Sequence, residues 1–120
     1  MSSDDLLVRH VERKGRGVFA RRRFLRGEII EQAPVLILGA DEYELLNHTT
    51  LRDYYYAWGE NACAIPMGLS MLYNYSSDPN AAAVRDIDAG TITFVALRDI
   101  ELDEEISHRY LCEPWFEVIS

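Results

Sequence analysis

The chain has 120 residues and a formal net charge of −8, and 48% of its residues are hydrophobic while 27% are charged. This balance is ordinary for a folded domain, and the length suffices for one hydrophobic core, so we expect residues 1–120 to form a single domain. The longest apolar run, residues 33–40, is far shorter than the ~20 residues that cross a bilayer, and the acidic N-terminus lacks the layout of a signal peptide. These features exclude a membrane-spanning protein and a classical secreted protein, and we expect a cytoplasmic location.

The charge is distributed unevenly along the chain. Residues 1–30 contain eight Lys and Arg against four acidic residues, whereas residues 31–120 contain four Arg against sixteen acidic residues. The acidic residues 31–120 are poorly suited to bind nucleic acid, because affinity for nucleic acid comes largely from Lys and Arg side chains that neutralise its phosphates. They are better suited to attract a cationic partner, such as a protein segment rich in Lys and Arg.

The two cysteines, Cys63 and Cys112, lie in no Cys-x-x-Cys pair. One disulfide between them is compatible with the sequence, but we expect reduced thiols in a cytosolic chain. They predict no metal site, because a structural zinc ion needs four ligands and the His and Cys residues do not cluster.

Glycine and proline residues divide the first half of the chain into short apolar or alternating runs, a pattern typical of many short strands. Strands are expected at residues 7–11, 18–20, 29–32 and 35–38. One helix follows, with Asp41 as its cap, Glu44 three residues later, and an apolar face of Tyr43, Leu45 and Leu46.

The second half of the chain shows the same punctuation. Strands are expected at residues 54–57, 63–65, 82–85, 91–96 and 105–108. Residues 85–91 predict a hairpin with Gly90 in its turn. The fold class expected from these runs is a β-rich α+β domain.

Two glycines one residue apart stand out in Lys14-Gly-Arg-Gly-Val-Phe-Ala20. Such a pair lets the backbone approach a ligand closely or adopt a positive φ. The spacing is not that of a Walker loop, and no third glycine or following helix supports a dinucleotide fingerprint. Taken alone, such a pair more often forms a plain tight turn.

Two later segments also carry polar groups suited to a site. In Asn74-Tyr-Ser-Ser-Asp-Pro-Asn80, Asn74 offers a donor and an acceptor to a polar ligand, although a surface loop capped by its own side chains is an equal alternative. In residues 96–110, Asp103 marks a turn and Tyr110 could donate a directional hydrogen bond from an apolar wall. The alternative there is a core tyrosine beside a solvated acidic face.

In this order the three segments resemble the SET-domain family. Gly-x-Gly-Val-Phe-Ala, followed by Arg26-Gly-Glu-Ile-Ile30, is similar to the family's opening. Residues 74–80 are similar to its Asn-His-Ser-x-x-Pro-Asn loop. Asp99-Ile, Asp103-Glu-Glu-Ile and Tyr110 are similar to its closing Ile-x-x-Gly-Glu-Glu-Ile and tyrosine. The resemblance covers residues 8–116, and the compact length is most similar to small stand-alone SET proteins of viruses and bacteria.

The resemblance implies a fold of several small, bent β-sheets with a knot-like threading and one or two short helices. It also implies a protein-lysine N-methyltransferase that uses S-adenosylmethionine. The residues that the resemblance assigns to the cofactor are Gly15, Arg16, Gly17, Asn74, Tyr75 and Trp115. It assigns catalysis to Tyr110 and Tyr54, and the lysine channel to Tyr54, Tyr56 and Tyr110, although alternation must place some of these rings in the core.

Departures from the family pattern keep other functions open. Tyr75 replaces the family's histidine, which supports a SET-fold module that binds the cofactor or a peptide with little or no transfer. Asp103 stands where a glycine is usual. A nucleic-acid-binding domain using residues 21–23 and Arg26 is a third class, which the acidic remainder disfavours. The partner expected is a basic, histone-like or other protein, with a nuclear location if it is a histone; no nucleic acid or membrane is expected, and a homodimer is compatible with so small a domain.

Overall fold

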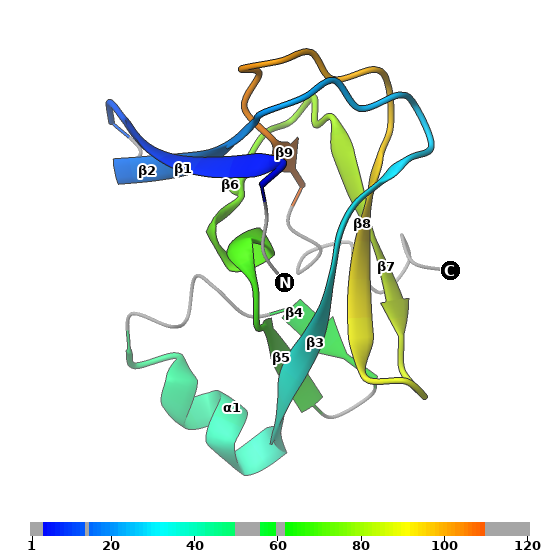
Figure 1. Cartoon of the computed structure of the whole chain (residues 1–120). Coiled ribbons are helices and arrows are strands. Elements are labelled where there is room, and N and C mark those ends of the chain that lie inside the picture. Colours follow the sequence, from blue (N-terminus) through cyan, green and yellow to red (C-terminus); the bar gives the residue numbers. More distant parts are fainter. Residues whose placement is uncertain (1–3, 14, 50–55, 60–61, 110–120) are drawn as a thin grey trace.

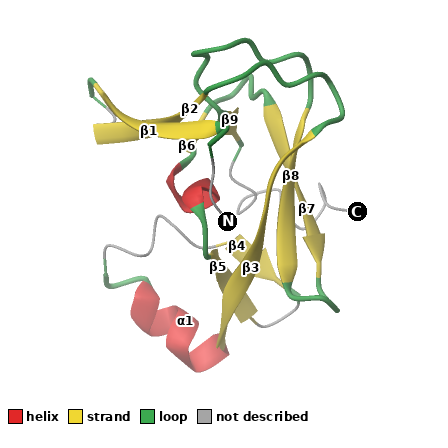
Figure 2. Ribbon diagram, in the orientation of Figure 1, coloured by secondary structure: helices red, strands yellow, loops and turns green. Residues whose placement is uncertain are grey.

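The computed structural model describes residues 4–13, 15–49, 56–59 and 62–109, with no statement on the side chains of Tyr43 and Ala57. These residues form three small sheets, one α-helix and one 3₁₀ helix (Figures 1 and 2). In chain order the elements are β1 (Leu6–Val11), β2 (Gly15–Ala20), β3 (Ile29–Gly39), α1 (Ala40–Leu46), β4 (Tyr56–Trp58), β5 (Ala62–Pro66), the 3₁₀ helix η2 (Leu69–Leu72), β6 (Asn74–Tyr75), β7 (Ala81–Asp86), β8 (Thr91–Ala96) and β9 (Ser107–His108). The expected β-rich α+β class with several small sheets is confirmed.

The first sheet is the antiparallel hairpin of β1 and β2, which runs from the pair Leu6 and Ala20 to the pair Val11 and Gly15. The hairpin lies apart from the largest sheet, at one end of the molecule (Figure 1). The two glycines of the opening motif, Gly15 and Gly17, lie at the start of β2, directly after the turn. The hairpin therefore holds these glycines at the end of a strand pair rather than inside the main sheet.

The largest sheet has the order β4-β5-β3-β8-β7, with every neighbouring pair antiparallel. The sequence predicts two strands on either side of Pro34, but the structure has one strand, β3, that continues through it. Residues 29–34 pair with β8 and residues 35–39 pair with β5. Pro34 lies where β3 changes its partner from β8 to β5. Its missing N–H therefore falls between two ladders of backbone hydrogen bonds and interrupts neither.

The helix α1 lies where the sequence predicts it, but its start and its buried face differ. The residue before its first turn is Gly39, whose N–H donates to the Glu42 carboxylate at 3.5 Å, so the expectation of an Asp41 cap with Glu44 is wrong. Leu46 is buried, whereas Leu45 is 69% exposed. The helix starts earlier because β3 runs directly into it, which leaves no separate capping loop.

The hairpin of β7 and β8 is confirmed, and Gly90 in its turn has a φ of 70°. The other predicted strands are present with ends shifted by at most one residue, except that β2 begins three residues earlier than expected and β9 is shorter; the expected start at residue 54 lies outside the described residues. Glu105 instead makes an isolated antiparallel bridge to Phe19. The sequence did not predict η2 or β6. In the described residues, no helix is long and apolar enough to cross a membrane.

The segment of residues 103–108 pairs with two distant parts of the chain. Its first half bonds to β2, where Ile106 N donates to Val18 O at 2.8 Å. Its second half, β9, runs parallel to β6, with Asn74 opposite Ser107 and Tyr75 opposite His108. This double pairing brings the three motif segments together (Figure 2).

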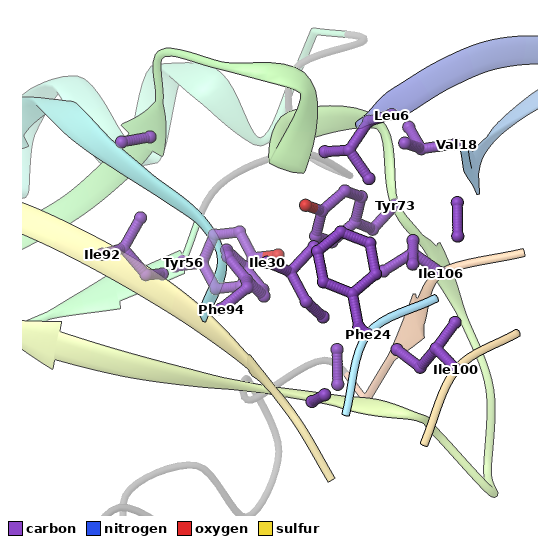
Figure 3. Packing of buried hydrophobic residues seen from close by; sticks show 14 of the residues in the cluster. Leu6, Val18, Phe24, Ile30, Tyr56, Tyr73, Ile92, Phe94, Ile100 and Ile106 are labelled. Atoms are coloured by element: carbon purple, nitrogen blue, oxygen red, sulfur yellow. The ribbon is translucent and has the colours of Figure 1, made fainter. Parts of the chain in front are cut away.

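One hydrophobic core joins the sheets. Phe24, Tyr73 and Phe94 pack at its centre, with the rings of Tyr73 and Phe94 edge to face at 4.9 Å (Figure 3). The cluster contains Leu6 from the hairpin, Ile92 and Phe94 from β8, and Ile106. The hairpin, the large sheet and residues 103–108 therefore share one core. Burial of this many large side chains is the main force that holds the motif segments in place.

Candidate functional site

Asn74 lies at the meeting point of the three motif segments. Its Nδ2 donates to the Arg16 carbonyl at 2.8 Å and to Glu105 Oε2 at 2.7 Å. One side chain thus ties β6 to the Gly-x-Gly run of β2 and to the Glu-Glu pair that precedes β9. The Oδ1 of Asn74 accepts no hydrogen bond from the part of the chain that the structure describes.

The two glycines next to Asn74 are required for different reasons. Gly15 has a φ of 88°, in the left-handed region that favours glycine, with open space around it. Gly17 has no such φ, but a Cβ there would lie 2.5 Å from Glu105 Oε2 and 2.9 Å from Asn74 Nδ2. Gly17 therefore lets the β2 backbone lie directly against the Asn74 amide and the Glu105 carboxylate.

The loop after Asn74 is tied both to itself and to β9. Ser76 N donates to the His108 carbonyl at 2.9 Å, and Asp78 N donates to Ser76 Oγ at 3.0 Å. The ring of Tyr75 is 48% exposed. The alternative of a loop capped by its own side chains therefore describes residues 76–78, while Asn74 faces the other segments.

At the far end of this loop, the buried side chain of Asn80 fixes residues 104–107. Its Nδ2 donates to the Glu105 carbonyl at 2.8 Å and to Glu104 Oε2 at 3.2 Å. Its Oδ1 accepts from Ser107 N at 2.8 Å. The loop that starts at one site asparagine and ends at another thus holds the segment that carries Glu105.

His108 and Tyr56 form a buried polar pair in the core. Tyr56 Oη and His108 Nε2 are 3.1 Å apart, and the side chains are 5% and 2% exposed. Burial lowers the pKa of His108 to about 4, against smaller opposing effects from hydrogen bonds with the backbone of Arg109 and Tyr73. The imidazole is therefore neutral at pH 7, and its Nδ1 lies 3.2 Å from the Arg109 carbonyl.

The remaining predicted site residues, Tyr54, Tyr110 and Trp115, lie outside the described residues, so their roles stay predictions. Tyr56 is the described member of the predicted lysine channel, and its hydroxyl faces His108 within the aromatic cluster. Its assignment to the substrate also stays a prediction.

The described residues fit the polar end of S-adenosylmethionine. A Cβ at Gly17 would meet Glu105 Oε2 and Asn74 Nδ2, so the Glu105 carboxylate supplies an acceptor suited to an ammonium group beside the β2 backbone, and the Asn74 side chain carries a second acceptor in its Oδ1. The half-exposed ring of Tyr75 follows immediately and offers an aromatic face. Among the described residues, no group of three His, Cys, Asp or Glu side chains could hold a metal ion.

The arginines of the basic segment are largely engaged with acidic residues. Arg22 pairs with Glu28 and Asp5, both at 3.2–3.3 Å, and Arg23 pairs with Asp99 at 2.9 Å and with Glu101 at 3.3 Å. The guanidinium of Arg22 also lies over the Phe24 ring at 4.0 Å. The Arg23 pairs and the Arg26 N–H, which donates to Asp99 at 2.8 Å, tie this segment to residues 99–101, and the pairing of Arg22 and Arg23 argues against the nucleic-acid alternative.

Two carboxylates were not predicted from the sequence, one in the site and one in its support. Glu105, in the site, contacts Asn74 and borders Gly17. Glu31 on β3 accepts hydrogen bonds from the η2 backbone. The signal for Glu105 was its place in the Asp103-Glu-Glu-Ile motif, but neighbouring Glu104 has the same chemistry, and only the pairing with β2 and β6 separates them.

The comparisons with known proteins agree with the order of the motifs. The model of the SET domain matches residues 15–111. A relative from Schizosaccharomyces pombe, "Histone-lysine N-methyltransferase, H3 lysine-37 specific", is 36% identical over 113 residues, which cover 93% of this chain and 77% of the relative. A "Variant-silencing SET domain-containing protein" from Plasmodium falciparum is 30% identical over 120 aligned residues, covering 88% of this chain and 5% of that protein.

Solved structures show the same fold. A crystal structure of a candidate histone methyltransferase from Plasmodium falciparum covers 95% of this chain and 99% of its own, with 27% identity and a TM-score of 0.72. The Neurospora SET domain protein DIM-5, a histone lysine methyltransferase, has 18% identity and a TM-score of 0.71, covers 88% of this chain and 51% of its own, and shows the fold alone. These relatives come from fungi and Plasmodium, so the expected particular likeness to viral and bacterial proteins gains no support. The chain belongs to the SET-domain family of protein-lysine methyltransferases.

Proposed function

We propose that this chain transfers a methyl group from S-adenosylmethionine to a lysine side chain of a basic protein, and that a histone is the first substrate to test. The observation that carries the proposal is the Asn74 amide, which joins the Arg16 carbonyl and the Glu105 carboxylate beside Gly17. The printed name of the fungal relative supports a histone substrate. A histone substrate would place the chain in the nucleus.

Several residues would hold the cofactor. Asn74 Oδ1 and the Glu105 carboxylate would accept hydrogen bonds from the amino group of its methionine part, and the backbone of residues 15–17 would lie along that part. Tyr75 and Trp115 would flank the adenine. When bound, the cofactor supplies an electrophilic methyl group on a sulfonium ion, and the protein aligns it with the nucleophile.

The lysine side would be built from Tyr54, Tyr56 and Tyr110. A free lysine amine has a pKa of about 10.4, so a methyl acceptor must be brought to its neutral form. Burial between aromatic rings beside a sulfonium cation lowers that pKa. In this proposal Tyr110 and Tyr54 orient the amine, and the ring faces favour the cationic methylated product.

The acidic body would draw the substrate. Asp41, Glu42 and Glu44 lie exposed on α1, and the chain as a whole carries −8. Complementary charge raises the rate of encounter with a Lys/Arg-rich segment. We also propose that residues 1–120 form one SET domain, which the single core from Leu6 to Ile106 supports.

A second function within the same fold is a module that binds the cofactor or a peptide with little transfer. The half-exposed Tyr75, in place of the family's histidine, favours it. A module that binds the cofactor shares cofactor binding with the enzyme, and a module that binds only a peptide does not; methyl transfer separates both modules from the enzyme.

The first test is a calorimetric titration with S-adenosylmethionine. We expect saturable binding by the wild-type protein and a Kd at least ~10-fold higher in Asn74→Ala, a loss of about 1.4 kcal/mol from the removed contacts. Asn47→Ala, at the exposed end of α1, is the matched control and should keep the wild-type Kd. An Asn74→Ala protein that binds as tightly as the wild type would remove Asn74 from the cofactor site.

A further inference from the structure

Glu31, on the central strand β3, sends its carboxylate to the start of the 3₁₀ helix η2. Its Oε1 accepts from Ser70 N at 2.7 Å, and its Oε2 accepts from Leu69 N at 3.0 Å. The hydroxyl of Tyr73 donates to Oε1 at 3.2 Å. One carboxylate therefore binds both the first turn of η2 and the residue that follows its end.

The backbone around this carboxylate is shaped to receive it. The β3–β8 register shifts between Ile29 and Glu31, an irregularity that changes where a strand side chain points. On the opposite side, a Cβ at Gly68 would lie 2.8 Å from Glu31 Oε2. Since φ at Gly68 is −170°, extended backbone, glycine is needed here for space and not for conformation.

The Tyr73 hydroxyl that contacts Glu31 stays in one protonation state. Tyr73 is 3% exposed and packs edge to face on Phe94. Burial and the neighbouring Glu31 carboxylate raise the pKa of Tyr73 well above 10. Its hydroxyl therefore stays protonated and donates throughout the physiological range.

The residue after Tyr73 is Asn74, which begins β6 and contacts Arg16 and Glu105. The path from the large sheet to the site thus runs from Glu31 through η2 and Tyr73 to the Asn74 amide. A shift of the backbone at Tyr73 would displace Asn74, because the two residues are adjacent in the sequence.

We propose that Glu31 is a positioning residue for the cofactor site, which sets the place of Asn74 through η2 and Tyr73. The proposal rests on the proposed function, in that the ligand used to detect it is S-adenosylmethionine. It assigns a role in ligand affinity to a side chain that does not itself border the site.

The test measures S-adenosylmethionine binding by calorimetry and methyl transfer in the wild type, Glu31→Gln and Tyr73→Phe. Glu31→Gln turns one acceptor atom into a donor that faces backbone N–H groups, so we expect the Kd and the KM for the cofactor to rise about 10-fold, with kcat at saturation within twofold. Tyr73→Phe keeps the packed ring and should raise the Kd about threefold. The control is Asp86→Asn, an exposed carboxylate that accepts the Ala89 N–H at 3.0 Å in the β7–β8 turn and should leave the Kd unchanged.

A purely structural role gives a different signature, a lower binding stoichiometry with an unchanged Kd. If the wild type binds and Glu31→Gln shows that signature, or binds identically, the inference is overturned while the proposed function stands. If Glu31→Gln does not fold, Tyr73→Phe decides, and an unchanged Kd in that variant overturns the inference. A wild type that does not bind S-adenosylmethionine overturns the proposed function itself.

Discussion

Gly17 shows how much a single absent methyl group can contribute to a site. Its backbone lies against the Asn74 amide and the Glu105 carboxylate, and both are held by other contacts: the Asn74 amide by Arg16 O at 2.8 Å, and the Glu105 carboxylate by Asn74 Nδ2 at 2.7 Å. Neither neighbour can give way without breaking one of these bonds. The sequence predicted that the glycine pair allows close approach, but not that the close approach is to the chain's own side chains.

Gly17→Ala should therefore damage both the site and the fold. We expect a loss of about 1–3 kcal/mol in the free energy of unfolding, since overpacking costs that much, and a Kd for S-adenosylmethionine at least ~10-fold higher. Urea unfolding and calorimetry measure the two effects. Gly39→Ala is the control, because its Cβ would meet nothing closer than 3.5 Å and its φ is −80°. Equal cofactor affinity in Gly17→Ala and Gly39→Ala would contradict this account of Gly17.

Asp103 departs from the family pattern, which has a glycine there, and its local geometry explains the difference. Its φ is 73°, in the left-handed region, and its N–H donates to the Ala20 carbonyl at 2.8 Å. Aspartate adopts this region more readily than most residues, and its carboxylate pairs with Arg9 at 3.3 Å. The turn that a glycine would form is therefore kept by an aspartate.

At the scale of elements, Asn80 carries the connection between the loop after β6 and the segment before β9. Its amide bonds to Glu104, Glu105 and Ser107, across more than 20 residues of sequence. The segment has little regular structure of its own, since β9 is two residues long. Its position therefore depends on side-chain contacts more than on a ladder of backbone bonds.

Asn80→Ala should lower the free energy of unfolding by about 2–4 kcal/mol, because it leaves buried donors and acceptors unpaired. Urea unfolding measures the loss. Gln32→Ala is the comparison: it removes an exposed amide with one side-chain bond, to Thr93 at 2.9 Å, and should cost well under 1 kcal/mol. Equal losses in the two variants would show that Asn80 does not hold this segment.

The elements also show which parts of the fold can be predicted locally. The β7–β8 hairpin was predicted because its turn residues and its strands are adjacent in sequence. The continuity of β3 through Pro34 was not, since it depends on two different partner strands, β5 and β8. The parallel pairing of β6 with β9 joins Asn74 to Ser107, and no local pattern reports such a contact. The motif order placed Asn74 at the site, whereas Glu31 and Glu105 required the tertiary arrangement.

At the scale of the whole molecule, the uneven charge along the sequence is partly cancelled in space. Arg22, Arg23 and Arg98 each pair with a carboxylate, and Asp99 and Glu101 reach back to the basic segment. These pairs are largely exposed and add little stability individually. They offset part of the local positive charge of the basic segment, while the net charge of −8 suits a basic protein substrate.

The stability of the whole fold should depend on His108. Its pKa in the fold, about 4, lies below the ordinary value of 6.5, so protonation between these values favours the unfolded chain. The free energy of unfolding should fall as the pH is lowered from 6.5 toward 4, by up to about 3 kcal/mol. Urea unfolding at a series of pH values measures this slope.

The control for that slope is the double variant Tyr56→Phe/His108→Phe, which removes the imidazole without leaving the tyrosine hydroxyl unpaired. Its free energy of unfolding should be nearly independent of pH from 6.5 to about 5. The lowered pKa values of Glu28 and Glu104 affect both proteins equally, at pH values below about 4.5. The same slope in both proteins would contradict the assignment to His108.

The measurement that tests the central claim most directly is transfer of a radiolabelled methyl group from S-adenosylmethionine to recombinant histones, by the wild type and by Asn74→Ala. We predict labelled lysine in a histone with the wild-type protein and a strong loss of label with Asn74→Ala at a cofactor concentration below the variant's Kd. Saturable cofactor binding with no label in histones or in other basic proteins would contradict the claim of a lysine methyltransferase and favour the binding module.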